Sequence, residues 1–122
     1  MSDTDTDTTA AGAGTTGWVA TVPLTALARR RRARVEIGDR AVALFLVGER
    51  VFAFDDVCIH KGRSLSRGVV WQGRVVCPAH QWAFDPGTGR AEGRDECQPV
   101  HDVAVIDGVV HVDPHPRRTE EI

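Results

Sequence analysis

The 122-residue sequence has no tyrosine, a single methionine and only three cysteines. So few cysteines do not form a disulfide framework, and they leave thiols available for metal or redox chemistry in a reducing compartment. Without tyrosine, no phenolic hydroxyl can act as an acid, a nucleophile or a hydrogen-bond donor. The sequence also has no CxxC pair, the usual source of ligands in a structural zinc site.

Two further absences bear on location and partners. No apolar run approaches the roughly 18 residues of a membrane span, and the acidic N-terminus lacks the basic-then-apolar order of a secretory signal. We therefore expect a soluble, cytoplasmic protein with no membrane partner. The formal net charge is −2, and the basic run Arg29–Arg34 has no interleaved aromatic residues. We interpret that run as a solvated connection and expect no nucleic-acid partner.

The chain is long enough for one small domain. Residues 1–17 contain no bulky side chain beyond Met1, which predicts a disordered N-terminal tail. Residues 113–122 combine prolines with charges and predict a flexible C-terminal tail. The folded domain is expected over residues 18–112.

Short β-rich runs separated by two-residue turns fill this domain. We expect an all-β fold of antiparallel sheets built from hairpins, with one helical turn over Pro23–Ala28. In the Gly-x turns, glycine supplies the positive φ of a type II′ turn. The expected strands are Arg34–Ile37, Ala41–Val47, Val51–Phe54, Gly68–Trp71, Arg74–Cys77, Val100–Ile106 and Val109–Val112.

Two short segments each place a cysteine close to a histidine: Cys58 with His60, and Cys77 with His80. A Rieske [2Fe-2S] cluster needs two cysteines on one iron and two histidines on the other, so each segment can supply one ligand to each iron. A zinc site with the same four residues is the competing interpretation. The spacing favours the cluster.

Residues 58–89 resemble the two cluster-binding loops and the intervening hairpin of Rieske-type ferredoxins. The likeness extends more loosely over residues 18–112. Ser64 stands where proline is usual in that family, and Gln81 where glycine is common. The shared positions are Gly62, Leu65-Ser66-x-Gly68, Cys77-Pro78, Trp82, Phe84, Asp85, Thr88 and Gly89, besides the four candidate ligands.

The supporting residues of the expected cofactor site are Gly62, Gly68, Pro78 and Trp82. Glycines let the main chain approach a cluster closely, and Pro78 stiffens the link between the second pair of ligands. Trp82 can shield the cluster from water, whereas we expect Phe84 to be ordinary core. Cys97 has no ligand partner at cluster spacing, and we expect it to be a small, partly buried thiol.

The resemblance also implies a reduction potential. Rieske centres span roughly −150 to +300 mV. High-potential members carry a disulfide between the loops and serine and tyrosine hydroxyls at the cluster. This chain has Gly62 or Arg63 and Ala79 at the disulfide positions, and Trp82 and Phe84 at the hydroxyl positions. We therefore expect a potential at the low end of the range.

The implied function is one-electron transfer from a flavin-containing, NAD(P)H-linked reductase to a terminal oxidoreductase. Our main interpretation is the small subunit of nitrite reductase, whose large subunit carries sirohaem. The alternative is the ferredoxin of a ring-hydroxylating dioxygenase, and an alternative of another class is a zinc-binding structural or interaction module. The main interpretation depends on four segments that resemble those of nitrite reductase small subunits. They are Ala43-Leu44-Phe45, Val51-Phe52-Ala53, Leu65-Ser66-Arg67-Gly68 and the acidic stretch around Cys97.

Overall fold

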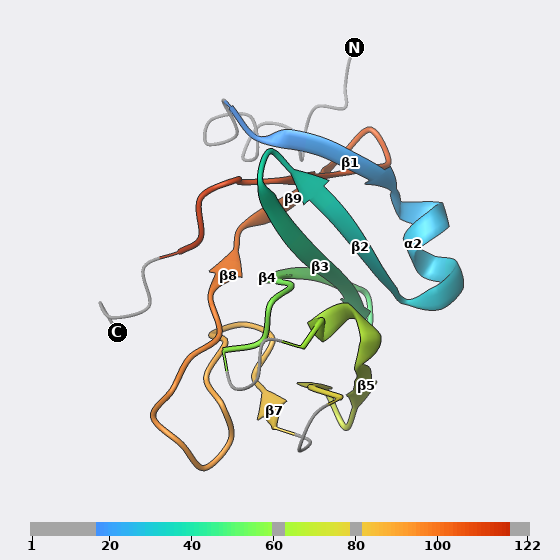
Figure 1. The fold of residues 1–122 in the computed structure, drawn as a ribbon. Helices are drawn as coiled ribbons and strands as arrows, with labels where there is room; N and C mark the ends of the chain where they lie inside the picture. Colours follow the sequence, from blue (N-terminus) through green and yellow to red (C-terminus); the bar gives the residue numbers. More distant parts are fainter. Residues whose placement is uncertain (1–16, 60–62, 79–81, 118–122) are drawn as a thin grey trace.

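The computed structural model describes residues 17–59, 63–78 and 82–117 (Figure 1). Within these ranges, no helix is long and apolar enough to cross a membrane. The elements are β1 (Val19–Pro23), α2 (Leu24–Arg30), β2 (Arg32–Ile37), β3 (Arg40–Val47), β4 (Arg50–Asp55), the 3-10 turn η1 (Leu65–Arg67), β5 (Val69–Trp71), β6 (Arg74–Val76), β7 (Ala83–Phe84), β8 (Val100–His101), β9 (Val103–Ile106) and β10 (Val109–Val112).

The strands form three antiparallel sheets, with the orders β1-β10-β9, β2-β3-β4-β8 and β5-β6-β7. The four expected hairpins are confirmed: β2-β3, β3-β4, β5-β6 and β9-β10. Gly38 and Gly48 each have a φ of 62° and open the first two turns as expected of type II′. In Figure 1 the β5-β7 sheet lies at the opposite end of the molecule from β1.

Strand β3 is buried on both of its faces, which explains its continuous apolar sequence. Val42, Leu44 and Leu46 face one core cluster, together with Leu27 of α2 and the inward valines of β10. Ala43 and Phe45 face a second cluster, which extends to the β5-β7 end of the molecule. The second cluster contains both Cys58 and Cys77.

Several predicted elements differ from the structure: β2 begins at Arg32, β6 ends at Val76, and β7 was not expected. Three further details are wrong. Pro23 is the residue before the helix, with an extended ψ of 146°, so α2 begins at Leu24. The run Val100–Ile106 is two strands, because the chain passes at Asp102 from the sheet of β4 to the sheet of β10. The strand expected from Gly68 begins one residue later, at Val69, after η1.

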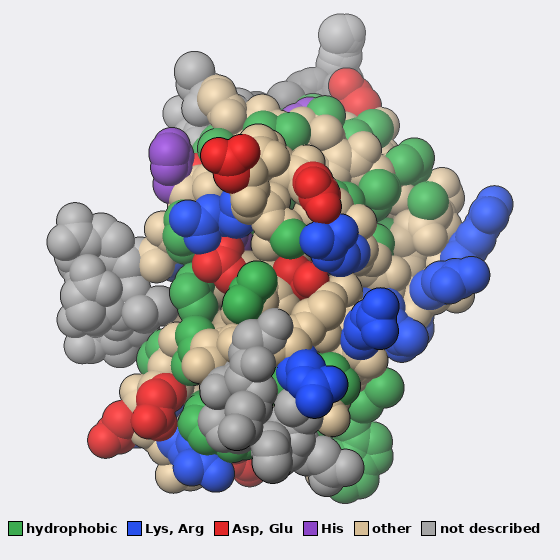
Figure 2. Space-filling model, in the orientation of Figure 1, with side chains coloured by type: hydrophobic (Ala, Val, Ile, Leu, Met, Phe, Trp, Pro, Cys, Tyr) green, Lys and Arg blue, Asp and Glu red, His purple; other side chains and the backbone are tan. Residues whose placement is uncertain are grey.

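The basic run and the C-terminal segment make defined contacts. The run begins at the end of α2, and basic side chains project on that side of the surface (Figure 2). Arg34, in contrast, binds Asp56 through Nε at 3.1 Å. At the other end of the chain, the amide of Arg117 donates to the carbonyl oxygen of Val100 at 2.7 Å, so residues 113–117 follow the domain surface.

Candidate metal centre

The two segments that carry the candidate ligands begin in the same way. The amide of Cys58 donates to the carbonyl oxygen of Arg63 at 2.9 Å, and the amide of Cys77 donates to that of Trp82 at 2.8 Å. Each cysteine therefore closes a loop with the residue five positions further on. We call residues 58–63 the first loop and residues 77–82 the second loop.

Both cysteines are buried, with 1% exposure for Cys58 and 0% for Cys77. They belong to one apolar cluster, in which Leu65, Phe84 and Val100 also pack. Two sulfurs at the starts of two matching loops, sheltered by one apolar core, fit a cluster whose cysteine-bound iron is kept from water. The donor set among the described residues is therefore compatible with a [2Fe-2S] group.

Asp56 anchors the first loop from one side. Its carboxylate accepts hydrogen bonds from the Ser66 amide at 2.7 Å, from the Ser64 hydroxyl at 2.5 Å and from Arg34. Its carbonyl oxygen accepts the amide of Leu65 at 2.6 Å. The Ser64 hydroxyl thus joins the chain segments that precede and follow the first loop.

The same contacts keep the Asp56 carboxyl ionised. Burial, with only 2% exposure, acts to raise its pKa. Hydrogen bonds from Ser64, Ser66 and Arg34 outweigh that effect and hold the pKa below its usual value. A buried carboxylate with several donors is a rigid point of attachment, so the start of the first loop is fixed by charge-assisted hydrogen bonds.

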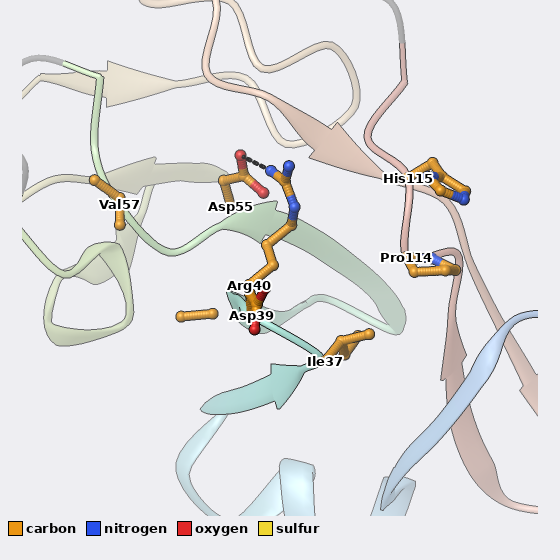
Figure 3. A pocket seen from close by; sticks show the side chains of 8 residues that line it. Ile37, Asp39, Arg40, Asp55, Val57, Pro114 and His115 are labelled. Carbon is orange, nitrogen blue, oxygen red and sulfur yellow. Dashed lines mark hydrogen bonds and ion pairs between the residues drawn. The ribbon is translucent and has the colours of Figure 1, made fainter.

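Asp55, one residue earlier, ties the end of β4 to the C-terminal part of the domain. Its carboxylate lies 2.7 Å from Arg40 Nη1 and 2.8 Å from His101 Nε2. Burial acts to raise the pKa of Asp55, but the hydrogen bonds with His101 and Arg40 lower it overall. The Arg40–Asp55 ion pair borders a hollow of about 540 Å³, which Asp39 also lines (Figure 3).

The second loop connects β6 to β7, whose register pairs Val75 with Phe84 and Val76 with Ala83. The loop is therefore the end of a hairpin. Gly68 packs against this hairpin, because a Cβ atom there would lie 1.9 Å from the carbonyl oxygen of Val76. Only glycine allows the chain leaving the first loop to pass this close to the strand that leads to Cys77.

Aromatic packing supports the second loop. Trp82 is partly buried, packs against the cluster that holds both cysteines and has its ring 6.4 Å from that of Phe84. The guanidinium of Arg94 lies 4.0 Å from the centre of the Trp82 ring. Phe84 is fully buried, which confirms that it is a core residue. Pro78 is exposed at the start of the loop.

His60, His80 and Gly62 lie outside the described residues. Within the described ranges, no group of three or more His, Cys, Asp or Glu side chains could hold a metal ion. Cys97 is half-buried, and its sulfur lies 4.0 Å from the carbonyl oxygen of Asp95.

Sequence reasoning missed Asp55, Asp56 and Gln98. The two acids directly after the apolar strand Val51–Phe54 are a signal that could have been used, because charges next to a buried strand need partners. Gln98 is fully buried and contacts the first loop, and nothing in the sequence around it marks it.

Together, the sheets and the two cysteine loops define a small β-protein with two cysteines buried in one core cluster. The chain belongs to the Rieske [2Fe-2S] domain family, whose model matches residues 17–106. The cofactor of this family is a Rieske [2Fe-2S] cluster, and the protein is an electron-transfer protein.

Similar proteins come from dioxygenase systems. The chain is 36% identical over 77 residues to the anthranilate 1,2-dioxygenase ferredoxin subunit of Burkholderia cepacia, covering 62% of this chain and 71% of that protein. It is 30% identical over 86 residues to the ferredoxin component of the naphthalene 1,2-dioxygenase system of Pseudomonas putida, covering 70% and 79%. In the complex of reduced oxygenase and oxidized ferredoxin in carbazole 1,9a-dioxygenase, one chain matches with a TM-score of 0.74 at 27% identity, covering 83% of this chain and 96% of that chain.

These relatives favour the alternative interpretation over the main one. Ferredoxins of ring-hydroxylating dioxygenases share the domain with this chain, and the expected small subunit of nitrite reductase is not supported by them. The short segments on which that expectation depended lie mostly in β3, β4 and η1, where core packing dictates the residues.

Proposed function

We propose that Cys58 and Cys77 hold one iron of the cluster and that His60 and His80 hold the other. The observation that carries this assignment is the matching closure of the two loops, each starting at a cysteine buried in the same core. The cluster supplies reversible one-electron transfer when it is bound. The chain keeps the two sulfurs away from water, and it fixes each cysteine by its backbone amide.

We further propose that the protein carries electrons, in the cytoplasm, from a flavin-containing NAD(P)H-linked reductase to the terminal oxygenase of a ring-hydroxylating dioxygenase. The named roles of the Burkholderia and Pseudomonas relatives support this partner class. Two exposed apolar side chains flank Cys58, with 59% exposure for Val57 and 42% for Ile59. Such a rim suits transient docking of a partner over the first loop.

The expected midpoint potential is low. Phe84 is packed in the core and has no hydroxyl, and the chain has no tyrosine to donate to a cluster sulfur. Without such a hydroxyl donor, the reduced cluster is less stabilised. A potentiometric titration should give a midpoint well below zero, and a value well above zero would overturn this part of the proposal.

The ligand assignment is tested by removing each ligand from the full chain. We expect Cys58→Ser, Cys77→Ser, His60→Ala and His80→Ala each to lose most of the iron and acid-labile sulfide. Cys97→Ser is the matched control, because its half-buried thiol lies outside both loops, and it should retain the cluster. Equal loss in the control, or full retention in any of the four variants, would contradict the assignment.

The partner class is tested by reconstitution with NADH and a flavin-containing ferredoxin reductase. We expect the cluster-containing protein to support product formation by the terminal oxygenase of a ring-hydroxylating dioxygenase. It should not support nitrite reduction by a sirohaem nitrite reductase. The Cys58→Ser variant should support neither reaction. Electron delivery to the nitrite reductase alone would overturn the proposed partner.

A further inference from the structure

Gln98 is a fully buried polar side chain beside the first loop, with 0% exposure. Its Nε2 donates to the carbonyl oxygens of Asp55 at 2.7 Å and Val57 at 2.8 Å. Its Oε1 accepts the amide hydrogen of Ile59 at 2.9 Å. A buried amide is tolerated only when its hydrogen bonds are made, and all three of these partners belong to the main chain around Cys58.

The Gln98 side chain continues a strand pairing that the main chain does not complete. Strand β8 pairs with β4 up to Phe54 opposite Val100, and the Asp55 amide then donates to Pro99 at 3.0 Å. Further along the chain, toward Cys58, the Gln98 side chain takes the place of a neighbouring strand. It thereby holds the main chain on both sides of the cysteine.

These contacts fix the backbone of Cys58. A peptide group is planar, so anchoring its N–H or C=O restrains the whole plane. The plane before Cys58 is held by Gln98 at the Val57 oxygen and by Arg63 at the Cys58 nitrogen. The plane after Cys58 is held by Gln98 at the Ile59 nitrogen. With both planes restrained, χ1 is the main freedom left to the sulfur.

Gln98 is itself anchored to the segment after the second loop. The backbone amide of Gln98 donates to the carbonyl oxygen of Gly89 at 2.7 Å. Gly89 has a φ of +81°, and a Cβ atom there would lie 2.2 Å from the Gln98 carbonyl oxygen. The close approach needs glycine, and it keeps Gln98 in place relative to the rest of the core.

We propose that Gln98 is a positioning residue for the cluster, an inference that rests on the proposed function. It fixes the direction in which Cys58 presents its sulfur to iron, and through that direction it sets the midpoint potential. The sulfur's orientation determines how it overlaps with the iron, so a change in it alters the cluster electronically as well as mechanically.

The test uses the loaded full-length protein with Gln98→Met, a side chain of similar length that cannot donate to the two carbonyl oxygens. We expect hydrogen exchange of the peptide containing Ile59 to quicken roughly ten- to a hundred-fold, in line with the loss of a buried hydrogen bond. The midpoint potential and the electron paramagnetic resonance g-values should both shift. Gln98→Glu, which keeps the acceptor for Ile59, should shift the potential with less change in exchange.

The matched control is Val112→Ala, which weakens the other core cluster away from the loops. It should lower the stability and leave the potential and g-values unchanged. An unshifted potential in Gln98→Met would overturn the proposal. Failure of both Gln98 variants to accumulate in folded form would also overturn it, because Gln98 would then be required for folding in general. A wild-type protein without iron and sulfide would refute the proposed function instead.

Discussion

The first and second loops are closed by equivalent backbone hydrogen bonds and are supported in different ways. Polar side chains support the first loop: Asp56 binds the residues that follow it, and Gln98 binds Ile59 at its start. Main-chain pairing of β6 with β7 and the stack of Arg94 on Trp82 hold the second loop. The difference shows that one cysteine loop can depend on satisfied buried polar groups, while its counterpart depends on hairpin geometry and aromatic packing.

This contrast has a structural cause. The second loop joins two strands that are already paired, so its ends are positioned by the sheet. The first loop is followed by η1, and its ends are joined by the isolated bridge between Val57 and Ser64. Where the ladder is this short, side-chain hydrogen bonds supply the missing restraint.

The largest expected effect comes from Gly68, where the chain after the first loop lies against β6, the strand that leads to the second loop. Gly68→Ala places a methyl group against the carbonyl oxygen of Val76 and must displace the strand leading to Cys77. We expect a loss of about 3 kcal/mol in the free energy of unfolding and reduced cluster content. Chemical denaturation measures the first quantity and iron analysis the second.

The matched control is Gly87→Ala, whose Cβ would meet a single side-chain oxygen at 3.3 Å. Its unfolding free energy should change by less than about 1 kcal/mol. Equal effects at the two glycines would show that the close contact between Gly68 and Val76 is unimportant.

The polar support of the first loop is tested at Asp56. Asp56→Ala leaves the Ser66 amide and the Ser64 hydroxyl without their acceptor, and we expect a loss of about 2–3 kcal/mol in denaturant unfolding. Glu36→Ala is the control, because Glu36 binds the same Arg34 from an exposed position. That change should cost less than about 0.5 kcal/mol. A reversed order would mean that the buried network does not support the loop.

The contribution of Asp55 to stability is expected to depend on pH. Because the folded-state pKa of Asp55 is lowered, its contribution to stability is complete above its unfolded-state pKa and disappears as the pH falls through the folded-state pKa. Unfolding measured from about pH 6 down to about pH 3 should show a steeper decline in the wild type than in Asp55→Asn, by about 1 kcal/mol in total. Parallel declines in the two proteins would contradict this role.

The smallest effect is expected at the aromatic stack of the second loop. Arg94→Gln removes the guanidinium from the Trp82 ring and should cost about 0.5–1 kcal/mol in unfolding free energy. The visible spectrum of the cluster should change slightly. Arg50→Gln removes a similar contact with Phe52, at 5.5 Å and away from both loops, and should leave the spectrum unaltered. A spectral change in the Arg50 variant alone would contradict the role of the Arg94–Trp82 contact in supporting the second loop.

Much of the fold followed from local patterns. The two-residue turns at Gly38 and Gly48 and the alternation in β10 are short-range signals, and the hairpins formed as expected. The break at Asp102 was not predictable from the apolar run, because it depends on which sheets β8 and β9 join. The roles of Asp56 and Gln98 depend on partners 10 and 43 residues away in the chain, which no local pattern reveals.

The central claim is that this chain binds a Rieske cluster through two cysteines and two histidines. Quantification of iron and acid-labile sulfide, combined with electron paramagnetic resonance of the reduced protein, tests that claim most directly. Our account predicts two irons and two sulfides per chain and a reduced-state signal that disappears in Cys58→Ser and Cys77→Ser. Zinc in the purified protein, with no sulfide and no such signal, would contradict it.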